Sequence, residues 1–132
     1  MQYRERPIPN FYQLLSQSVL VDMPLSGGDV ISLEDGLQIQ AVETPGHSNG
    51  SMSFVLNDKA VFTGDAIPVA HDLPIFVNDE QSIQSLDKIS ELSNIQYACP
   101  AWDEVYDKEK LTEVLNNSKG MLERLKSATF QV

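Results

Sequence analysis

Residues 43–66 read ETPGHSNGSMSFVLNDKAVFTGDA, and this stretch decides the expected fold of the chain. Two apolar runs, MSFVL and AVF, flank Asn57-Asp58-Lys59, a pattern typical of two short strands joined by a tight hairpin. Pro45-Gly46-His47 precedes the first run, and Thr63-Gly64-Asp65 follows the second. Because pairing brings the outer ends of the strands together, we expect the imidazole and the carboxylate at one end of the sheet, within about 8 Å.

A neutral imidazole and a carboxylate oxygen are ligands that zinc or a similar divalent ion accepts, and such an ion acidifies a bound water for hydrolysis. Gly46 and Gly64, one beside each candidate ligand, let the backbone turn sharply or approach closely because they carry no Cβ. Taken singly, His47 and Asp65 are each compatible with a structural role in a loop. Their joint pattern favours a metal site in which both are ligands.

At these residues the sequence resembles the metallo-β-lactamase superfamily. Residues 44–51, TPGHSNGS, resemble the family's Thr-Pro-Gly-His-Thr/Ser-x-Gly-Ser ligand motif, and residues 62–65, FTGD, resemble its Phe-x-Gly-Asp motif. The resemblance implies an α/β fold of the α+β type, half of an αββα sandwich in which a mixed β-sheet is backed by helices. It also implies hydrolysis of a small-molecule substrate with zinc or another divalent metal, where His47 holds the first ion and Asp65 bridges two.

The family's other ligand motif, His-x-His-x-Asp-His, is absent, since His47 and His71 are the only histidines. The resemblance therefore covers the C-terminal half of the fold, and a truncated product and a degenerate gene both stay open as explanations. Because a catalytic zinc keeps three protein ligands and this chain offers two, we expect weak or absent metal binding and no competent hydrolysis by the chain alone.

Three hypotheses follow from this incomplete motif set. In the first, the chain is the C-terminal portion of a metal-dependent hydrolase and works with its N-terminal half, in the same polypeptide or in trans. In the second, it is a non-catalytic half-fold that acts as a dimeric binding or scaffolding module. In the third, it is an unrelated small α/β domain with coincidental motifs, which would be favoured if the two loops lay far apart. The substrate is open, since relatives cleave thioesters, lactams, lactones and phosphodiesters.

Four further residues are candidates for the surroundings of the site. Ser48 follows the candidate histidine within its motif. Trp102 and Asp103 stand at what looks like the place of the family's last histidine; Trp102 cannot ligate, and Asp103 is interpreted as an exposed acid before a helix in preference to a metal ligand. His71 is interpreted as a loop histidine partly covered by a neighbouring proline, in preference to a substrate- or metal-binding group.

Length and composition favour one domain over residues 1–132, with residues 1–9 as an extended polar arm. No apolar run approaches the roughly 18 residues of a membrane span, and the first residues lack the apolar stretch of a secretory signal, so we expect a cytoplasmic protein without a membrane partner. A net charge of −10 opposes nucleic-acid binding. The single Cys99 excludes an internal disulfide and a cysteine-based zinc site.

Hydrophobic periodicity and turn residues place the other elements. The pattern predicts helices over about 11–19, from 79 to about 92 and from 107 onward, strands at 30–33, 37–42 and 95–99, and an irregular loop over 67–77. In the full fold the sheet would bury one face, including Leu37, Ile39, Phe54 and Phe62 when they share it, against the other half. Without that half we expect a homodimer with a mostly apolar interface above about 1,200 Å² in total.

Overall fold

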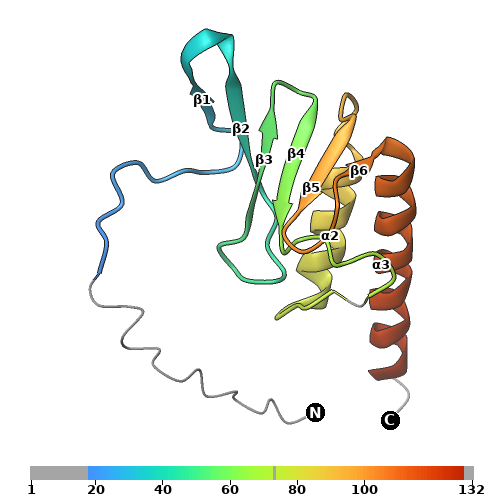
Figure 1. Ribbon diagram of the computed structural model, residues 1–132. Coiled ribbons are helices and arrows are strands. Elements are labelled where there is room, and N and C mark those ends of the chain that lie inside the picture. The colour runs from blue at the N-terminus through green and yellow to red at the C-terminus, as the bar shows by residue number, and fades with distance from the viewer. Residues whose placement is uncertain (1–17, 73, 130–132) are drawn as a thin grey trace.

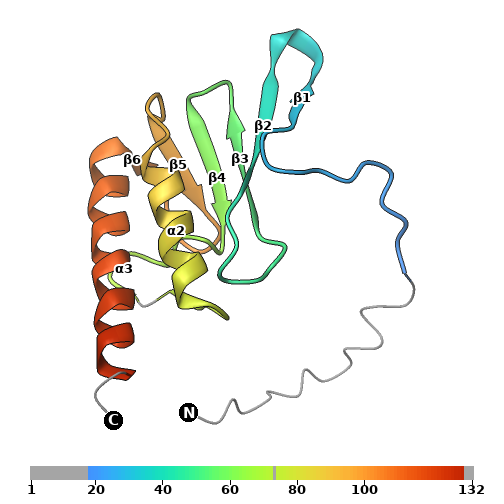
Figure 2. The ribbon, with the colours of Figure 1, turned by 180° about the vertical axis from the view of Figure 1, so that it is seen from behind.

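The computed structural model describes residues 18–72 and 74–129. Within them, one mixed sheet in the order β1-β2-β3-β4-β5-β6 is backed by two α-helices (Figure 1). The elements are β1 (Val30–Ser32), the 3-10 turn η1 (Glu34–Gly36), β2 (Gln38–Glu43), β3 (Met52–Leu56), β4 (Ala60–Gly64), α2 (Asp79–Ser90), β5 (Tyr97–Pro100), β6 (Tyr106–Asp107) and α3 (Lys108–Thr129). Seen from behind, α2 and α3 lie side by side in front of the strands, so both helices cover the same face of the sheet (Figure 2).

The predicted hairpin is confirmed as β3 and β4, which pair antiparallel with Phe54 opposite Phe62. Its turn carries positive φ angles at Asn57 (48°) and Asp58 (54°). Two consecutive left-handed residues suit the right-handed twist of paired strands, and Asn and Asp tolerate this conformation better than most residues. Strands β1 to β4 therefore form an antiparallel meander, to which β5 adds in parallel after the α2 crossover.

The hydrophobic core lies between the sheet and the two helices. Val55 and Val61 contribute from the hairpin and Ala98 from β5, and each is at most 3% exposed. The helices and the segments beside them add further buried side chains, namely Leu86, Ile89, Ile95, Tyr106, Leu111, Val114, Leu115 and Leu122. This one-sided core fixes the hairpin against α2 and thereby fixes the loops at both of its outer ends.

The opposite face of the sheet carries no helix in the described part of the chain. Ile39 pairs with Leu56, and Ala41 pairs with Phe54, which in turn faces Phe62, so these side chains share that face. Ala41 is buried, but Phe62 remains 46% exposed and Leu37, which precedes β2, 39%. The expected buried face of the strand over 37–42 is thus only partly covered. We call this surface, with Tyr97 of β5 (51% exposed), the open sheet face.

Both helices begin at the predicted places. The Asn78 side chain accepts a hydrogen bond from the Gln81 N–H (2.9 Å) and caps α2, while Asp107 Oδ1 accepts from the Lys110 N–H (2.8 Å) at the start of α3. Lys119 Nζ donates to Asp87 Oδ1 (2.7 Å), which links α3 to α2 and raises the pKa of the lysine. The two helices therefore form one continuous layer.

Some parts of the chain differ from the sequence-based expectation or fall outside the described residues. The short strand β6 was not predicted, because two residues are too few to show an alternating pattern. The arm over 1–9 and most of the helix over 11–19 lie outside the described residues, and Ser18 and Val19 have no regular structure. No helix in the described ranges combines the length and the apolar character needed to cross a bilayer.

Candidate metal centre

The hairpin brings the two candidate ligands to the same end of the sheet. His47 lies in the loop between β2 and β3, and Asp65 directly follows β4. His47 Nε2 is 3.6 Å from Asp65 Oδ2, well within the expected 8 Å, and both side chains are partly open to solvent (32% and 42%). The two motif loops are therefore adjacent. This arrangement opposes the hypothesis of an unrelated domain with coincidental motifs, which expected the loops to lie far apart.

The orientation of His47 is set by its second ring nitrogen. Nδ1 lies 2.9 Å from the carbonyl oxygen of Ile75. Because a carbonyl oxygen can only accept, Nδ1 carries a proton, and Nε2 is the ring nitrogen that faces Asp65 and can bind an ion. Metal-binding histidines typically have this arrangement, in which one ring N–H donates to a backbone carbonyl and the other nitrogen is free for the ion.

Gly46 holds this loop against the start of α2. Its carbonyl oxygen accepts hydrogen bonds from the N–H groups of Val77 (2.7 Å) and Asn78 (3.1 Å). Its φ of +138° suits only glycine, and a Cβ built there would lie 2.7 Å from the backbone N and Cα of Ser82. The glycine before the histidine is thus required both by conformation and by close packing.

Asp65 is held by a residue distant in sequence. Trp102 Nε1 donates a hydrogen bond of 2.7 Å to Asp65 Oδ1, while Oδ2 is the oxygen that faces His47. Trp102 cannot supply a lone pair, since the indole nitrogen is a donor only. The sequence placed Trp102 near the site, but nothing in the sequence showed this contact.

Two residues placed beside the site by the sequence have other partners. The His71 side chain is 69% exposed, with Nε2 4.0 Å from Glu113 Oε1 on α3, so this loop histidine is mostly open to solvent. Ser48 lies in the motif loop, where its Oγ is 2.8 Å from Ser51 Oγ. The loop beyond Asp65 therefore brings His71 beside α3.

Asp103 is an anchor within the loop that follows β5. Its Oδ2 accepts from the Tyr106 hydroxyl (2.6 Å) and the Ala70 N–H (3.0 Å), and its Oδ1 accepts from the Glu104 N–H (2.8 Å). The Tyr106 hydrogen bond, followed by those from the backbone, lowers the pKa of Asp103. Burial, and then the Asp103 carboxylate, raise the pKa of Tyr106. Both carboxylate oxygens of Asp103 therefore accept hydrogen bonds within the protein. The residue is half-buried, whereas the sequence was interpreted as placing an exposed acid here.

A mostly apolar pocket of about 200 Å³ adjoins the His47–Asp65 pair. Its other lining residues are Ile67, Pro68, Val69, Asp72, Ile75 and Trp102. Most of them belong to the loop predicted over 67–77, which has no strand in its described residues and lies beside the candidate ligands as expected. We call this cavity the site pocket.

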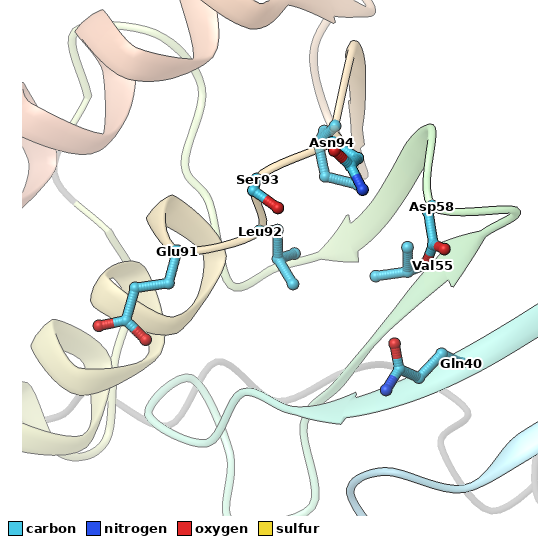
Figure 3. A pocket seen from close by; sticks show the side chains of 8 residues that line it. Gln40, Val55, Asp58, Glu91, Leu92, Ser93 and Asn94 are labelled. Atoms are coloured by element: carbon cyan, nitrogen blue, oxygen red, sulfur yellow. The ribbon is translucent and has the colours of Figure 1, made fainter.

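Another pocket of about 170 Å³ lies at the hairpin tip, at the other end of β3 and β4 (Figure 3). The Asp58 and Glu91 side chains in its lining lie apart, and the Glu91 carboxylate points away from Asp58 (Figure 3). This pocket also has no histidine or cysteine in its lining. Its donors therefore do not converge on a point where an ion could sit.

The donors of the candidate centre suit a divalent cation. Two ligand atoms 3.6 Å apart fit one ion with bonds of about 2.0–2.2 Å to each. Among the described residues, no group of three or more His, Cys, Asp or Glu side chains could hold an ion. His47 and Asp65 offer two candidate ligand atoms, and an ion in catalytic use needs at least one more protein ligand.

Comparison with known proteins finds a curated relative that matches two thirds of the chain. No family model matches the chain. The chain is 38% identical to an atrochrysone carboxyl ACP thioesterase of Aspergillus fumigatus over 91 residues, which make up 68% of the chain. That match covers 25% of the thioesterase, so the chain spans about a quarter of this relative's length.

Solved structures resemble the chain over a larger share. A metallo-beta-lactamase from Pontibacter korlensis matches with a TM-score of 0.67 at 12% identity, covering 85% of this chain and 53% of that one. A metallo-beta-lactamase family protein from Thermus thermophilus gives 0.64 at 19% identity, covering 80% and 36%. ETHE1 from Myxococcus xanthus gives 0.54 at 27% identity, covering 76% and 51%. The chain therefore spans about a third to a half of the length of these structures.

Proposed function

Because the chain has the metallo-β-lactamase fold over about half the length of such proteins, we propose that it is part of a metal-dependent hydrolase and contributes His47 and Asp65 to the metal site. The observation that carries this proposal is the pair itself, with Nε2 of a correctly oriented imidazole 3.6 Å from a carboxylate oxygen. When bound, the ion would polarise the scissile carbonyl and acidify a water.

We extend the proposal to acyl thioesters as the substrate class. The curated relative is a thioesterase, and its match includes two thirds of the chain. The site pocket supports this choice, because Ile67, Val69 and Ile75 give apolar walls beside the ligand pair. Such walls would bind the acyl part of a thioester and exclude water from its carbonyl, while His47 and Asp65 would hold the ion at the pocket's polar end.

The remaining ligands are proposed to come from the other half of the fold, in the same polypeptide or in trans. The chain spans about half of several structures with this fold, so the part of their length that it does not match is available for this role. The chain by itself then offers one imidazole and one carboxylate and would show negligible thioester hydrolysis. Activity would appear only when the complementary half completes the site.

The test is a thioesterase assay in trans. The chain would be combined with the N-terminal half of the Aspergillus fumigatus relative in the presence of zinc. Hydrolysis of an acyl thioester by this mixture would then be measured. We expect turnover from the mixture, its loss in His47→Ala, and little change in Asn49→Ala, an exposed residue of the same loop. Turnover that survives His47→Ala would contradict the proposed role of the histidine, and full turnover by the chain alone would show that no outside ligands are needed.

A second candidate function rests on the open sheet face. Phe62 and Tyr97 are each about half exposed on a surface that no described element covers. Clustered apolar side chains of this kind are uncommon on monomers and mark interaction surfaces. The alternative is therefore a non-catalytic, dimeric binding module in which a second copy covers this face. A homodimer that gains neither zinc binding nor turnover in the presence of the complementary half would favour this alternative over the hydrolase.

A further inference from the structure

The Trp102–Asp65 hydrogen bond belongs to the candidate centre, but Trp102 lies outside both sequence motifs. We propose that Trp102 is a positioning residue for the metal ligand Asp65, holding Oδ1 so that Oδ2 alone is directed at the ion beside His47. The inference rests on the proposed metal site. Its direct support is the 2.7 Å bond from Trp102 Nε1 to Oδ1, together with the 3.6 Å approach of Oδ2 to His47 Nε2.

The backbone on both sides of Trp102 is anchored to the segment that carries Asp65. On one side, the Ala101 N–H donates to the carbonyl oxygen of Gly64 (3.1 Å), the residue before Asp65. On the other side, Asp103 accepts from the Ala70 N–H (3.0 Å), in the loop that follows. These two links hold the backbone around Trp102 beside the segment that carries Asp65.

Packing does not account for the indole's position. Trp102 is 78% exposed, so the ring gains little from burial where it lies. Its N–H group has an acceptor with good geometry, and a hydrogen bond to a charged acceptor is stronger than one between neutral groups. The contact therefore contributes orientation of Asp65, which is what a ligand carboxylate needs from its neighbours.

The first arm of the test measures zinc binding by isothermal titration calorimetry. Trp102→Phe keeps an aromatic ring and removes the N–H donor, and we expect it to weaken zinc binding about 10- to 100-fold, the usual effect of losing a group that orients a ligand. Tyr97→Phe, a change at an exposed aromatic on β5, serves as the matched control and should bind zinc as the unaltered chain does. Equal affinity of Trp102→Phe and the unaltered chain would overturn the inference.

The second arm needs no metal and no change at Trp102. The chain has one tryptophan, so its indole N–H gives a single NMR signal whose position and exchange rate report the hydrogen bond. Asp65→Ala should move this signal and speed its exchange, whereas Asp72→Ala, at another carboxylate of the site pocket, should leave both unchanged. A signal indifferent to Asp65→Ala would overturn the inference.

These arms separate the two proposals. Zinc binding that depends on His47 but not on Trp102 would refute the positioning role and leave the metal site standing. Zinc binding that is unchanged in His47→Ala would instead refute the metal site itself and the positioning role with it. Zinc binding that requires His47 and is weakened by Trp102→Phe supports both.

Discussion

Replacing Gly46 with alanine tests the packing that holds the His47 loop. Alanine must adopt a φ of +138°, a region populated essentially by glycine, at a cost of about 1–3 kcal/mol. Its Cβ would also lie 2.7 Å from the backbone N and Cα of Ser82, and relieving such overpacking typically costs about 1–3 kcal/mol more. We expect Gly46→Ala to lower the free energy of unfolding by roughly 2–6 kcal/mol, a large fraction of a domain's stability of about 5–15 kcal/mol.

The assay is equilibrium urea unfolding followed by far-UV circular dichroism, with Gly50→Ala as the matched control. Gly50 belongs to the same motif, has no positive φ, and has no neighbouring atom within 4 Å of the position that an added Cβ would take. Its replacement should leave stability unchanged or raise it by at most about 1 kcal/mol. A Gly46→Ala chain within about 0.5 kcal/mol of the unaltered one would refute the argument that this glycine is required by close packing.

Three further changes test other parts of the molecule. Thr63→Val should raise the free energy of unfolding by about 1 kcal/mol in urea titrations, because the buried Oγ1 has no hydrogen-bond partner among the described residues; a loss of stability would indicate a missed partner. The pKa of Asp103 is lower in the folded than in the unfolded chain. Its ionised carboxylate therefore stabilises the folded state at pH values above the unfolded pKa of about 3.9, and this stabilisation is lost as the pH falls through the folded pKa. Asp103→Ala should therefore be less stable than the unaltered chain at pH 7, with a difference that shrinks in acid; a pH-independent difference would contradict this. Phe62→Ser, on the open sheet face, should convert the proposed homodimer into a monomer, as measured by light scattering. If light scattering gives a mass near 14.7 kDa for the unaltered chain, the chain is a monomer and the dimer is ruled out.

The hairpin and the proximity of its two candidate ligands were predictable because their signals are local. Two apolar runs, the Asn57-Asp58 turn and a glycine beside each candidate ligand all lie within residues 43–66, and strand pairing brings His47 close to Asp65. The caps of the helices were equally local. The helix-covered core and the uncovered face also followed from the resemblance, since a half sandwich has one partnered face.

The rest of the site depends on contacts between distant segments. The bond from Trp102 to Asp65 spans 37 positions, and the bond from His47 to the Ile75 carbonyl spans 28. No periodicity or motif encodes either contact. The approach of His71 Nε2 to Glu113 Oε1 on α3 (4.0 Å) likewise joins segments that are distant in sequence.

The most direct test of the central claim is anomalous diffraction at the zinc edge from crystals of the chain soaked in millimolar zinc. We expect an anomalous peak between Nε2 of His47 and Oδ2 of Asp65, with bonds of about 2.0–2.2 Å to each. Asp65→Ala crystals should lack that peak. Zinc found only elsewhere on the surface, or a peak at His47 that persists without the Asp65 carboxylate, would contradict the claim that these two residues form part of one metal site.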